Sequence, residues 1–305
     1  MAKPFVSIVI DTITVRENAG APLADALAPA MASVESQTYP RDRREIVVVL
    51  DEGVPPEAAD ALRRRYPSVK CAKASAANYF AGKNAGVAAA SGEIVTLIDG
   101  DCVAVPEWVE RLVAAFTPDA AGVAGFTRYA GHSLTVRTFS VPGFGHVAGK
   151  GDASGFNLSN VAFRREVLLA HPVDARLRRN GGCYFLFHQL RAAGQRVLYE
   201  RRAEVAHGVD RDGMIRKHFD RGYDGVSVYR LDANAVLRGT RWFRRFGAAA
   251  LLPITARRIF VDWIRLARHR RQMDVALIAL PYYAAVGVMT RLIELAGGLA
   301  AAVGE

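Results

Sequence analysis

The first half of the chain alternates short apolar runs with stretches whose apolar residues recur every three or four positions. The runs are rich in β-branched residues, as strands buried on both faces require. They lie at Val6–Ile10, Glu45–Leu50, Val69–Ala72 and Ile94–Ile98. Helices are predicted over residues 23–34, 56–65 and 83–90, and again from Pro106 onward. Strands that alternate with helices in this way predict βαβ units and a mostly parallel α/β sheet flanked by helices.

Polar residues follow three of the predicted strands. They are Asp11-Thr12, Asp51-Glu52 and Asp99-Gly100-Asp101. In such sheets ligands bind at the carboxyl ends of the strands, so chemistry is expected there. Two carboxylates on a glycine turn can hold one hard divalent cation, with a solvated turn as the alternative. Lys83, expected at a helix start between Gly82 and Gly86, is typical of a phosphate contact, with a solvated lysine as the alternative.

The composition is that of a globular protein, with 305 residues of which 51% are hydrophobic and 23% charged. Three cysteines without a CxxC spacing give neither a disulfide framework nor a zinc site, which indicates a reducing compartment. The apolar run Phe5–Ile10 is too short for a secretory signal. The 40 Lys and Arg outnumber the 30 Asp and Glu, and this net charge of +10 points to an anionic partner.

The excess charge lies in one stretch. From Arg238 to Arg271 there are ten arginines and one acid, Asp262, so the rest of the chain is nearly neutral. One helical face within this stretch is apolar and consists of Ile259, Phe260, Trp263, Ile264 and Ala267. A basic amphipathic helix of this kind is typical of an element at an anionic membrane surface. A helix packed on its own domain with a solvated arginine face is the alternative. The stretch has no interleaved aromatic platform, so no nucleic-acid partner is expected.

The segment Ala276–Thr290 is almost wholly apolar, although Pro281 interrupts it. Asp274 precedes it, and Arg291 and Glu294 follow it. The roughly 16 residues between these charges are fewer than the ~20 that a spanning helix needs. An in-plane or re-entrant segment, or a surface between copies of a homo-oligomer, is therefore expected rather than a clean transmembrane span.

Motifs across roughly the first 210 residues occur in an order typical of one enzyme family. They are Val6–Ile10, Ser33-x-x-Ser36-Gln37-Thr38-Tyr39-Pro40, Glu45–Asp51, Gly82–Gly86, Ala90–Glu93, Leu97–Asp101, Gly155–Arg165, Leu190–Tyr199 and Ala206-His207. In this combination the chain resembles family 2 glycosyltransferases, whose GT-A fold is a Rossmann-like sheet flanked by helices. We therefore expect a catalytic domain at residues 1–210 and a helical, membrane-associating extension at residues 211–305.

The resemblance implies a role for each matching residue. Asp11, Thr12, Asp51, Lys83, Asp99 and Arg221 are expected to bind the nucleotide-sugar. Arg221 lies in Lys217–Tyr223, which resembles a segment that many family members place over the acceptor side, and an ordinary surface arginine is the alternative. Asn157 and Asn160 are expected on the acceptor side. Asp99 and Asp101 are expected to hold Mg²⁺ or Mn²⁺ against the diphosphate with His207 as third ligand, and the cation would neutralise charge on the departing nucleoside diphosphate.

Two departures from the family pattern matter. The first strand leads into Asp11-Thr12-Ile13-Thr14 instead of a Pro-Thr-x-Asn-like turn, so nucleotide contacts are expected to differ. Gly182-Cys183 stand where the family carries the acidic pair that supplies the general base. Asp152, Asp174 or His188 can serve instead, with Asp152 and His188 as our catalytic candidates. An acceptor that is already anionic, such as a lipid phosphate, needs no base, and loss of activity is the third explanation.

These expectations combine into one prediction. The chain is predicted to transfer a sugar, with inversion, from a nucleotide-diphosphate sugar to a glycan, lipid or lipid phosphate of the cell envelope. It would act in the cytoplasm at the inner face of the plasma membrane. A degenerate glycosyltransferase that only binds its ligand is the alternative. A nucleotidyltransferase is disfavoured because Asp11–Gly20 is not the Gly-rich basic loop of that class.

Overall fold

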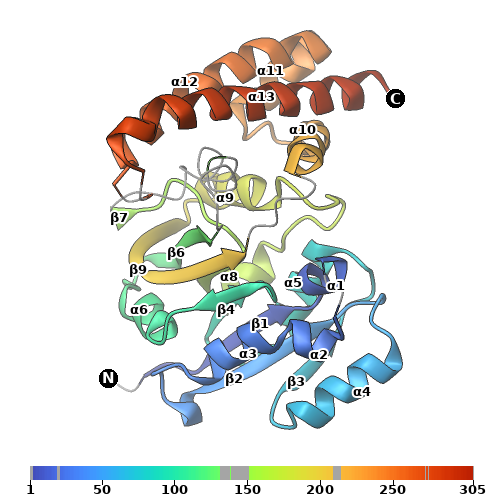
Figure 1. The fold of residues 1–305 in the computed structure, drawn as a ribbon, viewed down its shortest axis with the longest axis vertical. Helices are drawn as coiled ribbons and strands as arrows, with labels where there is room; N and C mark the ends of the chain where they lie inside the picture. The colour runs from blue at the N-terminus through green and yellow to red at the C-terminus, as the bar shows by residue number, and fades with distance from the viewer. Residues whose placement is uncertain are drawn as a thin grey trace.

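The computed structural model describes residues 3–18, 21–130, 138, 151–208, 214–271, 273 and 275–304. Within these ranges nine strands form one mixed sheet in the order β3-β2-β1-β4-β8-β6-β9-β5, with β7 paired to β9 (Figure 1). The strands are β1 (Val6–Asp11), β2 (Arg44–Leu50), β3 (Lys70–Lys73), β4 (Ile94–Ile98), β5 (Cys102–Ala104), β6 (Ala120–Ala130), β7 (Gly151–Asp152), β8 (Asn160–Arg164) and β9 (Arg196–Gly208). The pairs β1–β2, β1–β4 and β2–β3 are parallel, as expected for βαβ units, whereas β8 is antiparallel to both β4 and β6.

Helices cover both faces of this sheet, and their apolar residues form two core clusters. On one face lie α5 (Tyr79–Ala89), α8 (Arg165–Ala170) and α9 (Gly182–Ala192). On the other lie α2 (Leu23–Ala26), α3 (Ala28–Glu35), α4 (Pro56–Arg65) and α6 (Trp108–Ala114). Neighbouring residues of β1 alternate between the clusters: Val9 joins the first, and Ile8 and Ile10 join the second. Each such apolar side chain stabilises the folded state by about 1.5–3 kcal/mol when it is fully buried. This burial favours a β1 strand that has no solvent-exposed face.

The predicted strands are confirmed, and two predicted helices differ in their limits. The helix predicted over residues 23–34 is divided at Leu27, just before Pro29, into α2 and α3. The helix predicted from Lys83 begins four residues earlier, because the side chain of Asn78 accepts hydrogen bonds from the amides of Phe80 and Ala81, both at 2.9 Å, and caps it. Lys83 therefore lies in the second turn of α5 and not at its start.

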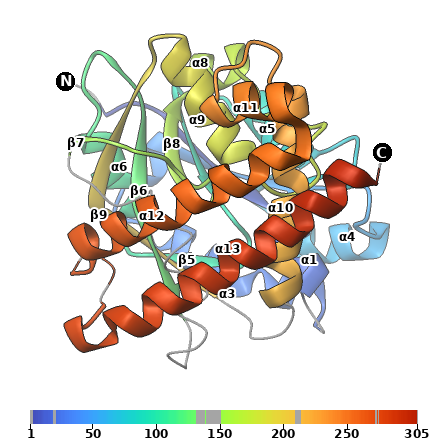
Figure 2. The same ribbon diagram turned by 90° about the horizontal axis from the view of Figure 1, so that it is seen from above.

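The chain ends in four helices that form a layer at the end of the molecule remote from β1–β3 (Figure 1). They are α10 (Met214–Leu231), α11 (Arg238–Phe246), α12 (Leu251–His269) and α13 (Leu280–Val303), with short 3₁₀ turns η3 (Gly247–Ala250) and η4 (Leu277–Ala279). Figure 2 shows α12 and α13 running side by side across this layer. Residues Leu277–Val303 are long and apolar enough to cross a membrane by length and composition. The helix thus continues well beyond the segment marked out by the sequence pattern.

Two glycines bring α10 and α13 into close contact. The α carbon of Gly222 faces the backbone of Glu294, and a Cβ added there would lie 1.8 Å from the Glu294 carbonyl oxygen. Gly297 faces the Phe219 carbonyl oxygen in the same way, at 2.0 Å. The backbones can approach this closely only because neither position carries a side chain.

The charged residues of α13 lie on its inner side. Arg291 donates to Asp262 of α12 at 2.7 Å and to Glu294 at 2.5 Å, and all three are buried. Glu294 also lies 3.2 Å from His218 of α10 and from Arg258 of α12. This network joins α10, α12 and α13, so the charges that appeared to bound the apolar segment hold the layer together.

Candidate active site

The Asp99-Gly100-Asp101 turn follows β4 directly, as expected, and it requires its glycine. The amide of Cys102 donates to the Asp99 carbonyl oxygen at 3.1 Å and closes the turn. A Cβ on Gly100 would lie 2.6 Å from the Asp11 carbonyl oxygen, so no larger residue fits against β1. Asp99 is buried, whereas the side chain of Asp101 keeps 24% of its exposure. The turn therefore offers one fixed carboxylate and one that solvent or a ligand can reach.

Strand pairing brings His207 to this turn. β5 begins at Cys102 and runs antiparallel to β9, with Cys102 opposite His207. The His207 Nε2 atom lies 3.5 Å from the Asp101 Oδ1 atom. Among the described residues, Asp99, Asp101, Cys102 and His207 form a cluster whose ligand atoms all lie within 4.8 Å of one another. Carboxylate oxygens and one imidazole suit Mg²⁺ or Mn²⁺, so this donor set fits the expected cation.

Cys102 belongs to the cluster but was not predicted. Its Sγ atom lies 3.7 Å from Asp101 Oδ1. Burial, together with the charges of Asp99 and Asp101, raises the pKa of this thiol well above its ordinary value. Its position next to Asp101 is the only signal in the sequence, and a single cysteine after a strand is more often a small buried side chain.

Lys83 lies inside the protein and does not reach the surface of the site. Its Nζ atom lies 2.8 Å from Asp11 Oδ2 and 2.7 Å from Asp99 Oδ1, and it donates to the Ile98 carbonyl oxygen at 2.8 Å. Burial works against the ammonium, but Asp11 and Asp99 outweigh it and hold the pKa of Lys83 above its ordinary value. Both interpretations from the sequence, phosphate contact and solvated lysine, are therefore wrong. Lys83 instead neutralises the two carboxylates beneath the turn.

Tyr79 completes the support of Asp99. Its hydroxyl group donates to Asp99 Oδ1 at 2.8 Å, and burial, followed by the charge of Asp99, raises its pKa well above the ordinary value. The guanidinium of Arg179 lies 4.7 Å from the centre of the Tyr79 ring. Burial raises the pKa of Asp11, with the charge of Asp99 acting in the same direction and Lys83 opposing both.

Asp51 lies beside Thr12, as the resemblance implied, and both are buried. The Thr12 hydroxyl donates to the Val49 carbonyl oxygen at 2.7 Å and lies 3.3 Å from Asp51. Arg16, which was not predicted, pairs with Asp51 at 2.9 Å. Asp11 caps α1 (Ile13–Asn18) by accepting from the Thr14 amide at 3.0 Å. The unusual turn after β1 therefore begins a helix, which delivers Arg16 to Asp51.

The two predicted acceptor-side asparagines have different surroundings. Asn160 is completely buried, and it accepts from the Trp108 indole at 2.8 Å and donates to the Ala203 carbonyl oxygen at 3.2 Å. Its amide is therefore committed to the protein interior, which corrects its assignment to an acceptor. Asn157 is also buried, and its backbone carbonyl oxygen accepts from the backbone N–H of Asn160 at 3.0 Å.

Asp152 lies away from the cluster. It pairs with Leu198 of β9, while His207 is near the other end of that strand. On β6, Leu198 pairs with Val123 and His207 pairs with Tyr129. These two partners are six residues apart, which corresponds to about 20 Å along the strand. The Asp152 side chain is 67% exposed and pairs with Arg196 at 2.6 Å. The structure therefore does not bring this candidate base to the metal cluster.

The other candidate bases also have separate partners. Asp174 pairs with Arg176 at 2.6 Å, and its hydrogen bonds from Arg176 lower its pKa. His188 packs edge-on against Tyr184 and Phe187 of α9, and burial lowers its pKa. Both lie outside the cluster of acidic, cysteine and histidine ligands.

The position of the absent acidic pair has no room for a carboxylate at residue 182. A Cβ on Gly182 would lie 2.5 Å from the buried Phe80 ring. Burial raises the pKa of the Cys183 thiol to about 11, which leaves it protonated near neutral pH. Gly182 and Cys183 therefore cannot supply an ordinary base.

Arg221 and Asp224 both lie on α10, and each contacts an element other than the Asp99-Gly100-Asp101 turn. Arg221 is close enough to Glu294 of α13 to help lower the pKa of that carboxyl, which places Arg221 near α13. Asp224, which was not predicted, is buried and accepts from the Asn180 side chain at 2.8 Å. Nothing in the local sequence marks Asp224, because only the packing of α10 brings it to the loop before α9.

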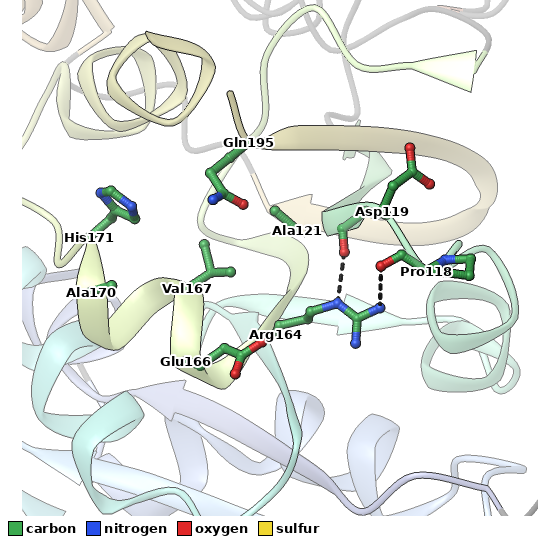
Figure 3. Close-up of a pocket in the computed structure, with 10 residues that line it drawn as sticks. Pro118, Asp119, Ala121, Arg164, Glu166, Val167, Ala170, His171 and Gln195 are labelled. Carbon is green, nitrogen blue, oxygen red and sulfur yellow. Dashed lines mark hydrogen bonds between the residues drawn. The ribbon is translucent and has the colours of Figure 1, made fainter. Parts of the chain in front are cut away.

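A shallow cavity of about 450 Å³ lies away from the candidate active site, beside the first residues of β6 and β9 (Figure 3). Ala120 of its lining pairs with Arg196 at the start of β9, whereas His207 is near the end of that strand. Arg164 donates to the Ala120 and Pro118 carbonyl oxygens at 2.9 and 3.3 Å beneath it. This cavity contains none of the predicted site residues.

Comparison with known proteins identifies the family. Residues 10–166 match the sequence family described as Glycosyl transferase family 2, which is just over half of the chain. The chain belongs to this family. It is 28% identical over 126 residues to glycosyltransferase AglE of Haloferax volcanii, over 40% of this chain and 38% of AglE. It is 25% identical over 247 residues to glucosyl-dolichyl phosphate glucuronosyltransferase of the same organism, over 72% of this chain and 75% of that protein. The chain thus spans well under half of AglE and three quarters of the second relative.

Solved structures share the GT-A fold. The mannosyltransferase PcManGT from Pyrobaculum calidifontis, in complex with GDP-Man and Mn²⁺, superimposes with a TM-score of 0.63 at 14% identity, covering 100% of this chain and 89% of PcManGT. GalNAc-T7 with UDP, GalNAc and Mn²⁺ superimposes with a TM-score of 0.56 at 16% identity, covering 79% of this chain and 50% of that chain. The glycosyltransferase family and the GT-A fold expected from the motifs are confirmed.

Proposed function

We propose that the protein transfers a sugar from a nucleotide-diphosphate sugar to a glycan or lipid-linked acceptor, with inversion at the anomeric carbon. The observation that carries this proposal is the convergence of Asp99, Asp101 and His207 at the end of β4. Family membership supports the reaction class, and the ligands of the two solved neighbours, a nucleotide or nucleotide-sugar and Mn²⁺, support the donor and cation.

Each residue of the site has a part in this proposal. Asp99, Asp101 and His207 would hold Mg²⁺ or Mn²⁺, which when bound supplies positive charge against the diphosphate. Lys83 and Tyr79 fix Asp99 from beneath, so the carboxylate is positioned before any ligand arrives. Asp51 and Thr12 would contact the nucleoside at the edge of the same sheet. The acceptor would attack the anomeric carbon from the face opposite the leaving diphosphate, which gives inversion.

A thermal-shift panel tests this proposal. UDP-, GDP- and dTDP-sugars are each added to the purified protein with Mn²⁺, with Mg²⁺ and with EDTA. One donor is expected to raise the melting temperature only when the cation is present, because a ligand that binds the folded state alone stabilises it by mass action. If no nucleotide-sugar shifts the melting temperature in any metal condition, the proposed function is wrong.

A second candidate function is a degenerate member of the family that binds a nucleotide-sugar without transferring it. The observation that favours it is the Gly182-Cys183 pair in place of the acidic pair. Slow, Mn²⁺-dependent hydrolysis of the donor in the absence of acceptor would exclude it, because hydrolysis requires an intact leaving-group site.

We also propose that residues 211–305 dock the catalytic domain, residues 1–210, on the cytoplasmic face of an anionic membrane. Large apolar side chains are exposed on the outer helices: Trp242, Phe246, Leu252, Phe260, Trp263, Leu277, Ile278, Tyr282, Met289 and Leu292. We call these residues the outer apolar face. Arg241, Arg245, Arg257 and Arg268 are exposed on the same helices. Apolar side chains with cationic neighbours complement the interior and the headgroups of an anionic bilayer.

A further inference from the structure

Gly182 and Cys183, at the start of α9, stand where the family pattern has an acidic pair, and Gly181 precedes them. Gly181 has a φ of 85°, in the left-handed region that favours glycine, and a Cβ there would lie 2.6 Å from Val228 of α10. Gly182 lies against the Phe80 ring. Backbone and packing exclude a side chain at positions 181 and 182, and position 183 carries a thiol, so no carboxylate stands at this point.

The loop before these glycines carries two arginines that each stack on a tyrosine ring. The Arg179 guanidinium lies over the Tyr79 ring, 4.7 Å from its centre, and the hydroxyl of the same ring donates to Asp99. One aromatic ring thus separates this cation from the first carboxylate of the metal cluster. Arg178 lies over the Tyr223 ring at 5.3 Å, and its side chain is 64% exposed. The loop thus presents positive charge a few residues before Gly182-Cys183, the position at which the family pattern has negative charge.

Asp224 fixes this loop from α10. It is buried and accepts from both the amide and the side chain of Asn180, at 3.1 and 2.8 Å. Its Oδ1 atom lies 3.6 Å from Arg178 Nε. A carboxylate this deeply buried and bound to the loop positions the arginines. The arrangement runs from α10 through the arginine loop to Tyr79 and the Asp99 carboxylate.

We propose that Arg178 and Arg179 bind a phosphate group of the acceptor, whose ionised oxygen is the nucleophile. This inference rests on the proposed function and names the acceptor class for the same site. The phosphate oxygen forms a bond to the anomeric carbon, while the bond from that carbon to the nucleoside diphosphate breaks and its electron pair leaves with the diphosphate. No proton moves, because the attacking oxygen is already ionised. The absent acidic pair is then not needed, and guanidinium groups match phosphate oxygens in charge and geometry.

Direct binding of a short isoprenyl phosphate, such as citronellyl phosphate, tests the site without any donor. Calorimetry compares the full-length protein with its Arg178→Ala, Arg179→Ala and Arg176→Ala variants. Arg176 is the matched control, since it lies in the same loop, is 71% exposed and, within the part of the chain that the structure describes, pairs with Asp174. Loss of Arg178 or Arg179 is expected to weaken phosphate binding by about 10- to 100-fold. The Arg176 variant is expected to bind like the wild type, and citronellol should not bind comparably.

Transfer assays separate this inference from the proposed function. With the donor selected by thermal shift, the wild type should glycosylate citronellyl phosphate and not citronellol. The Arg178 and Arg179 variants should lose that transfer through a higher KM for the phosphate, while they keep Mn²⁺-dependent donor binding and hydrolysis. Arg179→Lys should recover only part of the affinity that Arg179→Ala loses. An ammonium keeps the positive charge but lacks the planar fork with which a guanidinium binds two phosphate oxygens side by side.

Two outcomes would overturn the inference while the proposed function stands. One is a wild type that hydrolyses the donor but binds isoprenyl phosphate no better than the alcohol. The other is an Arg179 variant that loses donor binding together with acceptor binding, which would assign this arginine to the donor diphosphate. Unfolding curves of each variant exclude misfolding as the cause.

Discussion

The ammonium of Lys83 lies 2.7 Å from Asp99 and 2.8 Å from Asp11, so the Asp99-Gly100-Asp101 turn rests on a buried ion triad. Each charge in this triad is removed from water, and its opposite charge comes from within the triad, with further hydrogen bonds from Tyr79 to Asp99 and from the Thr14 amide to Asp11. The geometry ties the stability of the sheet to the position of Asp99, the first residue of the proposed metal site.

Replacing Lys83 by Met should therefore destabilise the protein strongly. Two buried carboxylates would lose their counter-ion, and a cost of about 3–5 kcal/mol in the free energy of unfolding is expected. Urea unfolding measures it. Lys3→Ala, which removes the exposed Lys3–Glu110 pair and a cation–π contact with Tyr39, should cost only about 1 kcal/mol. Equal costs for the two variants would contradict the internal role of Lys83.

Removing Asp101 should separate metal binding from folding. Its carboxylate is partly exposed, so Asp101→Ala should unfold close to the wild-type midpoint. The Mn²⁺-dependent thermal shift should disappear, and sugar-nucleotide turnover should fall on the order of 100-fold or more. Asp119→Ala is the control, because that carboxylate is exposed and pairs with Arg196 far from the turn. Full activity of the Asp101 variant would exclude this residue as a ligand.

The catalytic half of the fold was largely predictable from the sequence, because β1, β2 and β4 are buried on both faces and read as continuous apolar runs. The Asp99-Gly100-Asp101 turn was predictable for the same reason, since it follows the last of these runs. The register of β5 against β9, which brings His207 to Asp101, depends on strands about 100 residues apart and was implied only by the family resemblance.

The errors concern burial and long-range packing. Lys83 was assigned to the ligand because glycines surround it, whereas the Asn78 cap shifts the helix start and turns the lysine inward. Asn160 was assigned to the acceptor, but its amide binds Trp108 and Ala203. Arg16 and Asp224 lie in segments with no local motif. Their partners, Asp51 and Asn180, are 35 and 44 residues away in the sequence, so periodicity carries no signal for these pairs.

The crossing of α10 and α13 should depend on Gly222. Gly222→Ala would place a methyl group against the Glu294 backbone, and the forced separation of the helices should cost about 1–3 kcal/mol or more. Gly225→Ala is a matched control in the same helix, since a Cβ there meets nothing within 4 Å. That control should stabilise the protein by about 0.5–1 kcal/mol, because alanine favours a helix over glycine. Thermal unfolding of both variants measures the difference in sign.

Glu294 should make the stability of the helical layer depend on pH. Burial opposes its charge, but Arg258 and Arg291 outweigh this effect and hold its pKa well below the ordinary value of 4.5. A carboxylate with a lowered pKa contributes stability above its unfolded pKa and loses it as the pH falls further. Glu294→Gln should therefore cost about 3 kcal/mol at pH 7 and clearly less at pH 3.5.

Urea unfolding at the two pH values measures this dependence. The exposed Glu57→Gln variant should show no comparable change. A difference between wild type and Glu294→Gln that stays constant from pH 7 to pH 3.5 would contradict the ionised network.

Charge on the outer apolar face should weaken membrane docking without unfolding the protein. Phe260 and Ile278 are 61% and 92% exposed, so the variants Phe260→Asp and Ile278→Asp should fold normally. Each should weaken sedimentation with vesicles containing phosphatidylglycerol by about 10-fold or more, because an apolar side chain no longer enters the bilayer. Leu169→Asp, on α8 of the catalytic domain, is the control and should bind like the wild type.

Added salt should weaken wild-type binding, since the arginines contribute through screened attraction to anionic headgroups. Equal binding to neutral vesicles, or a stable dimer in sedimentation velocity that these aspartates dissociate, would assign the outer apolar face to a partner other than an anionic membrane.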